Sequence, residues 1–320
     1  MLKIHSEIGP RTAYVESTYK WPPRDVAKLH TTLEKYYADT LSNPSRISNH
    51  PRATTLREEI LADVPELRRL AKQVLHLLET THSALILKAA HLTDFDLDTK
   101  RRLLYVMSLA LGWPTPTDSV GKQVIWDVKN RRVPQGQVST FSENAHAARL
   151  HTDTQYFSKP ERYTLLYVVL PAVNGGVSIV RDGRDVKKAM LRSDQGKWAI
   201  AYLTKTQLPF RIPTTYTRER RQDTPEITYA PVFSDRPKIR YRKDTLEAGL
   251  IVDPRLDTAE TRRALGILEN ALEDPGSAIS TALPADSLLI SNNHEGLHGR
   301  TEFSDPDRHL IRIRISDVPA

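Results

Sequence analysis

The chain has 320 residues, a formal charge of +7 and 39% hydrophobic residues, and no apolar run approaches the roughly 20 residues that a membrane span needs. It contains no cysteine, which excludes disulfides, thiolate metal ligands and a cysteine nucleophile. Any metal must therefore be held by nitrogen and oxygen. With no secretory signal at the N-terminus, we expect a cytoplasmic protein.

Residues 1–115 are predicted to form a mainly helical part that packs on the rest of one domain spanning 1–320. Apolar residues at helical spacing predict a helix over 24–38. A second helix is expected to begin near Pro65, a favourable first-turn residue. A third is expected over about 98–111, where Gly112 ends it.

From about residue 121 the pattern changes to short apolar or alternating runs separated by turn residues. This spacing predicts an antiparallel sandwich or barrel. The predicted strands are 122–128, 137–142, 148–157, 162–170, 177–181, 197–203, 238–242, 286–291 and 308–315.

Two further segments interrupt these strands. One helix is expected over about 258–273, begun by a capping box of Asp257 and Glu260 and ended by Pro275-Gly276. The stretch 205–236 is rich in Pro, Thr and charged residues, which predicts a long loop or lid.

His151 and Asp153 are candidate metal ligands. In a strand, residues i and i+2 point to the same face, so the imidazole and the carboxylate would lie side by side. A second histidine would complete a facial set of two histidines and one carboxylate, the set that leaves open positions on iron(II). A hydrogen-bonded pair without metal is the common alternative. His294 and His298 both follow the apolar run at 288–290 and compete for the third position.

The segment 308–315 alternates between an isoleucine face and a face with three arginines, Arg308, Arg312 and Arg314. The ordinary interpretation is a solvated outer face. Near a metal site, the alternative is that a guanidinium binds an anionic ligand through paired hydrogen bonds. The Gly175-Gly176 turn before Ser178 would let backbone approach such a ligand closely, although most such turns have no ligand.

Taken together and in order, these motifs resemble the taurine dioxygenase/clavaminate synthase-like superfamily over roughly 85–316. The motifs are His-x-Asp at 151–153, Gly-Gly-x-Ser at 175–178, Asn-x-x-x-x-His-Gly-Arg-Thr-x-Phe at 293–303 and Asp-Arg at 307–308. The resemblance implies a double-stranded β-helix, or jelly-roll, core at 116–316 and an iron(II)-dependent dioxygenase that consumes 2-oxoglutarate and O2.

Individual roles also follow from the resemblance. It implies that His151, Asp153 and His298 hold iron, and it selects His298 because Gly-Arg follows that histidine. Ser178 and Arg308 match the residues that bind 2-oxoglutarate, and Arg312 matches a second basic position near the same site. Because halogenases of this kind have a small residue where Asp153 stands, halogenation is disfavoured.

The substrate is expected to be a small molecule, an amino acid or its derivative in a biosynthetic pathway, which is hydroxylated, desaturated or cyclised. A small organic acid or sulfonate oxidised in catabolism is the alternative. Candidate substrate contacts, each with solvent exposure as the simpler interpretation, are Gln155, Tyr156, Arg240, Arg242 and Glu295.

Three other classes compete with this interpretation. A zinc hydrolase would use the same ligands but would leave Ser178 and the arginines without a role. A jelly-roll binding protein would keep the site without catalysis. The pI near 9.4 also suggests a nucleic-acid binder, but the basic residues are scattered among acidic ones, so neither nucleic acid nor a membrane is expected as a partner.

Overall fold

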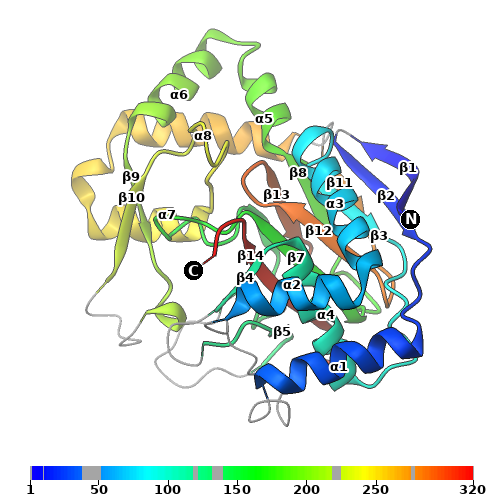
Figure 1. Cartoon of the computed structure of the whole chain (residues 1–320). Coiled ribbons are helices and arrows are strands. Elements are labelled where there is room, and N and C mark those ends of the chain that lie inside the picture. Colours follow the sequence, from blue (N-terminus) through cyan, green and yellow to red (C-terminus); the bar gives the residue numbers. More distant parts are fainter. Residues whose placement is uncertain are drawn as a thin grey trace.

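The computed structural model describes residues 2–9, 11–37, 52–117, 122–131, 140–217, 225–274 and 278–319. Its centre is a pair of β sheets that pack face to face, with helices around them (Figure 1). Apolar residues of both sheets meet between them, including Val168 and Leu310 from one sheet and Val180 from the other.

The larger sheet has eight strands in the order β1-β2-β3-β12-β7-β14-β4, with β5 also paired to β14. All neighbours are antiparallel except β2 and β3. The strands are β1 (Leu2–Gly9), β2 (Thr12–Ser17), β3 (Ala84–Leu87), β4 (Trp113–Thr115), β5 (Trp126–Val128), β7 (Tyr163–Leu170), β12 (Leu288–Asn292) and β14 (His309–Ser316).

The smaller sheet has four antiparallel strands in the order β11-β8-β13-β6. They are β6 (Ala148–His151), β8 (Ser178–Asp182), β11 (Ile279–Thr281) and β13 (Gly296–Arg300). The two sheets with flanking helices confirm the predicted jelly-roll class.

The first four helices cover the outer face of the larger sheet. They are α1 (Pro23–Tyr37), α2 (Ala53–Asp63), α3 (Pro65–Thr80) and α4 (Leu97–Leu111). Their apolar stripes pack against side chains that point outward from the sheet, among them Ile311, Ile313 and Ile315. Because side chains alternate along a strand, Arg308, Arg312 and Arg314 point to the opposite face, between the sheets. The solvated outer face considered above is therefore wrong.

A second group of helices packs together away from α1, α2 and α4 (Figure 1). It consists of α5 (Gly183–Met190), α6 (Asp194–Lys205), α7 (Lys243–Val252) and α8 (Ala259–Glu273). These helices share an apolar core with the hairpin of β9 (Leu208–Arg211) and β10 (Ile227–Ala230). Short 3-10 turns lie at Thr214–Tyr216 and Pro254–Leu256.

The structure corrects several predicted elements. The predicted strand 197–203 lies in α6, which Ser193 caps by accepting a hydrogen bond from the Gly196 amide. The strands β1 and β2 belong to the part predicted as mainly helical. Residues 238–242 form only an isolated bridge, between Ile239 and Phe233.

The start of one helix and the predicted lid also differ from expectation. Thr258, not Asp257, caps α8, while Pro275-Gly276 lies outside the described residues. The described part of the predicted loop or lid at 205–236 contains regular structure, because β9 and β10 form a hairpin there. Residues 137–139 of a predicted strand fall outside the described ranges, and 140–142 are not in a strand.

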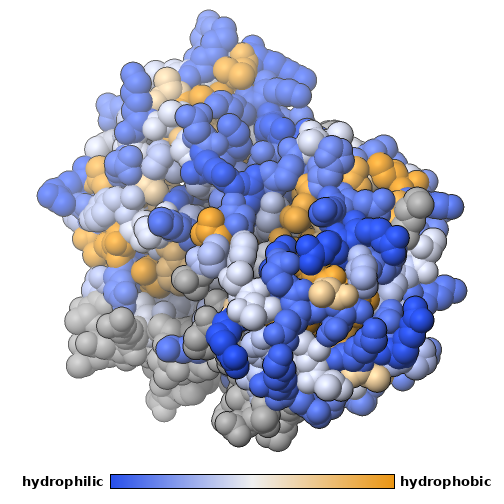
Figure 2. Space-filling view, viewed as in Figure 1, coloured by the Kyte–Doolittle hydropathy of each residue, from blue (hydrophilic) through white to orange (hydrophobic). Residues whose placement is uncertain are grey.

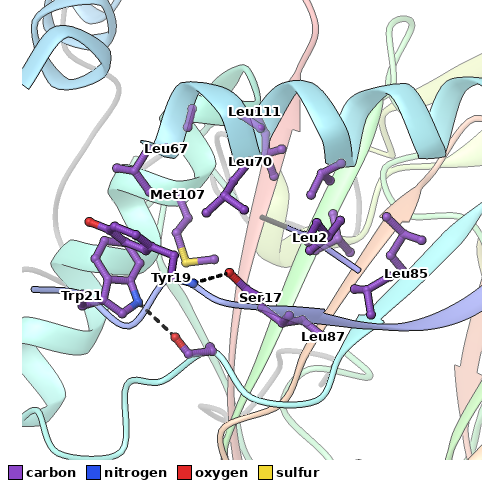
Figure 3. A pocket seen from close by; sticks show the side chains of 16 residues that line it. Leu2, Ser17, Tyr19, Trp21, Leu67, Leu70, Leu85, Leu87, Met107 and Leu111 are labelled. Atoms are coloured by element: carbon purple, nitrogen blue, oxygen red, sulfur yellow. Dashed lines mark hydrogen bonds between the residues drawn. The ribbon is translucent and has the colours of Figure 1, made fainter. Parts of the chain in front are cut away.

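One apolar cavity of about 60 Å³ remains between the sheet and the helices α3 and α4 (Figure 3). Leu67, Val74 and Leu85 line it, and Trp21 closes one end while its indole donates to the carbonyl of Ala90. Apolar cavities of this kind represent incomplete packing, and water gains little by entering them.

The surface view in Figure 2 is mainly hydrophilic, with hydrophobic residues only in scattered patches. Among the described residues, no helix has both the length and the apolar character required to cross a membrane.

Candidate metal centre

His151, Asp153 and His298 come together between the two sheets. His151 ends β6, and His298 lies directly opposite it on β13. Their ring centroids are 4.5 Å apart. One potential ligand atom from each of the three residues lies within 4.8 Å of the others, close enough for a single ion. His151 and Asp153 are buried, and the His298 side chain is 19% exposed.

The two imidazoles are prepared to act as ligands. The His151 Nδ1 donates to the carbonyl oxygen of Arg149 at 2.8 Å, which leaves Nε2 available. Burial lowers the pKa of His151, and the neighbouring His298 lowers it further. Burial likewise lowers the pKa of His298. Both rings are therefore neutral near pH 7, the form that binds metals.

Asp153 is fixed through its backbone and kept ionised by arginines. Its amide donates to Asn293 Oδ1 at 2.7 Å, and Asn293 Nδ2 donates back to its carbonyl at 3.0 Å. Burial opposes ionisation, but Arg312 and Arg314 hold the pKa of Asp153 well below its usual range. Its buried Oδ2 has no hydrogen-bond partner and lies 3.9 Å from His298 Nε2. Two neutral imidazoles and an unpartnered carboxylate oxygen fit a divalent cation.

A second polar pocket lies where β8 and β14 begin. A cavity of about 30 Å³ is lined by Gly175, Gly176, Ser178 and Arg308. Arg308 is 3% exposed, and its Nη1 has no partner. Burial lowers the pKa of Arg308 to about 10, which leaves it charged at neutral pH. Gly176 has φ +63°, and a Cβ there would stand 3.0 Å from Arg308 Nε, so glycine is needed for this close approach.

Arg312 and Arg314 lie beside Asp153, one of the candidate metal ligands. Arg312 Nη1 is 3.4 Å from Asp153 Oδ1, and Arg314 Nη2 is 3.7 Å from the same oxygen. Arg312 therefore lies next to Asp153, and its match to a basic position near the 2-oxoglutarate site stays a prediction. Arg314 was given no role by sequence reasoning, although the alternation of β14 had already put it on the same face.

Tyrosines cover Arg314. Its guanidinium carbon is 5.4 Å from the ring centroid of Tyr216, and Tyr216 stacks on Tyr156 at 5.7 Å. Tyr216 belongs to the hairpin segment, so this segment reaches the site. Burial raises the pKa of Tyr216, but Arg312 and Arg314 outweigh it and lower the pKa overall.

The remaining candidate residues have varied surroundings. Gln155 and Tyr156 are buried beside the ligands, and the Gln155 Oε1 and the Tyr156 hydroxyl lack partners. Arg240 donates to the carbonyls of Gln155, Phe157 and Ser158, which clamps the loop after Asp153.

The other three candidates make specific contacts of their own. Arg242 pairs with Asp244 at 2.8 and 2.9 Å. Glu295 pairs with Arg184 and Arg11, away from the ligands. His294 is not in the ligand cluster, and its Nε2 donates to the carbonyl of Pro160 at 2.9 Å.

A facial set of two histidines and a carboxylate inside a jelly roll defines the class of mononuclear non-haem iron oxygenases. The model of one family, described as "Taurine catabolism dioxygenase TauD, TfdA family", matches residues 49–314. The chain belongs to this family, and it is therefore an iron(II)- and 2-oxoglutarate-dependent dioxygenase, as the sequence motifs predicted.

Solved structures agree in fold. An asparagine oxygenase in complex with Fe(II), 3-hydroxyasparagine and succinate has a TM-score of 0.66 at 16% identity, covering 95% of this chain and 93% of that one. The non-haem iron oxygenase OrfP with Fe and α-ketoglutarate has a TM-score of 0.58 at 14% identity, covering 94% of each chain. OrfP with Fe, succinate and (3S)-hydroxy-L-Arg has a TM-score of 0.63 at 14% identity and the same coverage. A search of curated protein sequences found no relative.

Proposed function

We propose that this dioxygenase hydroxylates a C–H bond of a free amino acid or an amino-acid derivative. The observation that carries the proposal is the arrangement between the sheets. The ligand triad lies beside buried, incompletely paired Arg312 and Arg314, with a separate arginine pocket at Arg308. One arginine pocket serves the cosubstrate, and the arginines at the metal serve an acidic group of the substrate.

His151, Asp153 and His298 would hold iron(II), which supplies the oxygen-activating redox chemistry when bound. Ser178 and Arg308 would bind the distal carboxylate of 2-oxoglutarate. The buried, unpartnered Nη1 of Arg308 supports this role, because a buried guanidinium without an acceptor is costly unless an anion completes it.

Substrate positioning falls to residues between the metal and the hairpin. Gln155 and Tyr156 each carry a buried oxygen without a partner, and Gln155 is held by its amide hydrogen bond to Thr245 at 2.7 Å. An ammonium group would satisfy these oxygens. Tyr216 excludes water from the same side. Amino-acid substrates also agree with the similar solved structures, which hold hydroxyasparagine or hydroxyarginine.

The test is a screen for succinate release. The anaerobically purified protein is supplied with iron(II), 2-oxoglutarate and air, together with the common amino acids, their N-acyl derivatives, small organic acids and sulfonates. We expect an amino acid or derivative to stimulate succinate release and to gain the mass of one oxygen atom. Stimulation by sulfonates or organic acids alone would contradict the amino-acid assignment.

A further inference from the structure

Arg312 and Arg314 are two residues apart on β14, so their side chains leave the same face of one strand. Arg314 is 0% exposed, and its Nε, Nη1 and Nη2 all lack hydrogen-bond partners. The Nε and Nη2 of Arg312 lack partners as well. Five guanidinium nitrogens at one site therefore have no acceptor within the described part of the chain.

The carboxylates nearby do not meet this demand. Asp153 is the acid that forms ion pairs with both arginines, and it is also a ligand of the proposed iron. Glu161 contributes to raising the pKa of Arg314, but its Oε1 accepts from Thr115 and the described residues show no ion pair between it and Arg314. Asp244 is used by Arg242. Among the described residues, no further carboxylate forms an ion pair with Arg312 or Arg314, which points to acceptors on a bound ligand.

One carboxylate pairs with one guanidinium fork through two parallel hydrogen bonds. Two buried forks at one site call for two anionic groups, because like charges held together without counter-ions destabilise a fold. The Tyr216 ring over Arg314 adds a cation–π contact but no acceptor for in-plane N–H groups.

We propose that the substrate carries two anionic groups, one for Arg312 and one for Arg314, as in an acidic amino acid of the aspartate or glutamate type. This inference rests on the proposed function, which requires only one acidic group. Arg308 is assigned to 2-oxoglutarate and is not one of the arginines that bind the substrate in this proposal. It lies just before β14, on the far side of Leu310 from Arg312 and Arg314.

The experiment uses two pairs of nearly isosteric probes, L-aspartate with L-asparagine and L-glutamate with L-glutamine. Binding is measured by titration calorimetry without oxygen, on protein loaded with iron(II) and 2-oxoglutarate so that the cosubstrate pocket is filled. At least one acid should bind the wild type about tenfold or more tightly than its amide, the range expected of a charge-assisted contact.

Arg314→Met should remove most of that preference, because the acid should lose far more affinity than the amide. Arg314→Lys should keep part of it. Arg181→Met is the matched control, because Arg181 is equally buried but caps the end of α8 through the carbonyls of Leu272 and Asp274. The Arg181→Met variant should bind the acid and the amide with the same ratio of affinities as the wild type.

Equal affinity for acid and amide in both pairs, an unchanged ratio in Arg314→Met, or no binding of any probe would overturn the inference. A protein that oxidises neutral amino acids without preferring acids would retain the proposed function and lose this inference. Binding of the acids with the predicted preference, but without succinate release, would count against the proposed function alone.

Discussion

Arg312 and Asp153 are joined across the interior of the barrel, with Nη1 3.4 Å from Oδ1. The arginine keeps the carboxylate ionised in a buried site, while the opposite oxygen, Oδ2, stays free for a metal. Arg308, four residues earlier on the same face, has no such carboxylate partner among the described residues. The two arginines therefore have different surroundings, which supports the separate roles proposed for them.

Arg308→Met is expected to raise the concentration of 2-oxoglutarate needed for half-maximal turnover by about 10- to 100-fold, the value of a lost charge-assisted contact. Iron(II) affinity should change little, because Arg308 does not touch the ligands. Anaerobic metal titration and succinate assays measure the two quantities separately. If Arg312→Met produced this 2-oxoglutarate phenotype and Arg308→Met did not, the assignment of the two arginines would be reversed.

His298→Ala is expected to abolish iron(II) binding and turnover, because it removes one of three ligands. His294→Ala is the matched control: this histidine lies four residues away but bonds the carbonyl of Pro160 instead. Its metal content should match the wild type. The iron content of each variant is measured after anaerobic reconstitution and gel filtration. An equal loss of iron in His298→Ala and His294→Ala would mean that the distal ligand is misassigned.

Acid is expected to destabilise the metal-free protein through its buried histidines. Burial lowers the pKa of His294, so the unfolded chain, with a pKa near 6.5, binds more protons than the folded one as pH falls. The stabilising contribution is complete above about pH 6.5 and is lost below it.

His294→Gln keeps a donor for Pro160 and removes this titration. Urea unfolding at pH 7.5 and 5.5 should show a smaller loss of stability in the variant, by up to about 1.4 kcal/mol per pH unit. His151 and His298 shift in the same direction in both proteins and cancel in the comparison. Identical losses would show that His294 does not contribute.

Val74→Ile is expected to stabilise the fold by about 0.8 kcal/mol, because Val74 lines the 60 Å³ apolar cavity and the added methylene would fill part of it. Val74→Ala should act in the opposite direction by enlarging the same cavity. The midpoint of urea unfolding measures both. Destabilisation by the larger residue would show that the cavity wall does not accommodate it.

The jelly-roll class and the ligand motif were predictable because both leave short-range signals. The alternation of 308–315 follows from the two-residue period of a strand. The expectation that His151 and Asp153 share a strand was wrong, because β6 ends at His151 and Asp153 lies in the turn that follows it. The helices α1, α3, α4 and α8 were likewise close to expectation, since their apolar stripes repeat at helical spacing.

Two features depend on tertiary packing and could not be predicted from the sequence: the helix at 194–205 and the buried face of β14. Residues 197–203 carry an apolar run that suits a strand, but Ser193 caps a helix and Ala199, Ile200 and Leu203 pack into the second core. The alternation of β14 did not say which face was buried. The buried environment of each face is set by the smaller sheet on one side and by the helices on the other. The sequence therefore placed Arg314 on a face of the strand, but it could not place Arg314 beside Asp153.

The position of His298 opposite His151 makes the metal centre sensitive to the alignment of two strands. β6 is an edge strand of the smaller sheet, and the pair already contains an irregularity between His298 and Arg300. A slip of one residue would turn one imidazole to the outside of the barrel. An iron(II) ion held by both histidines would therefore bind only when the two strands are correctly aligned, and it would stabilise the native arrangement of this edge.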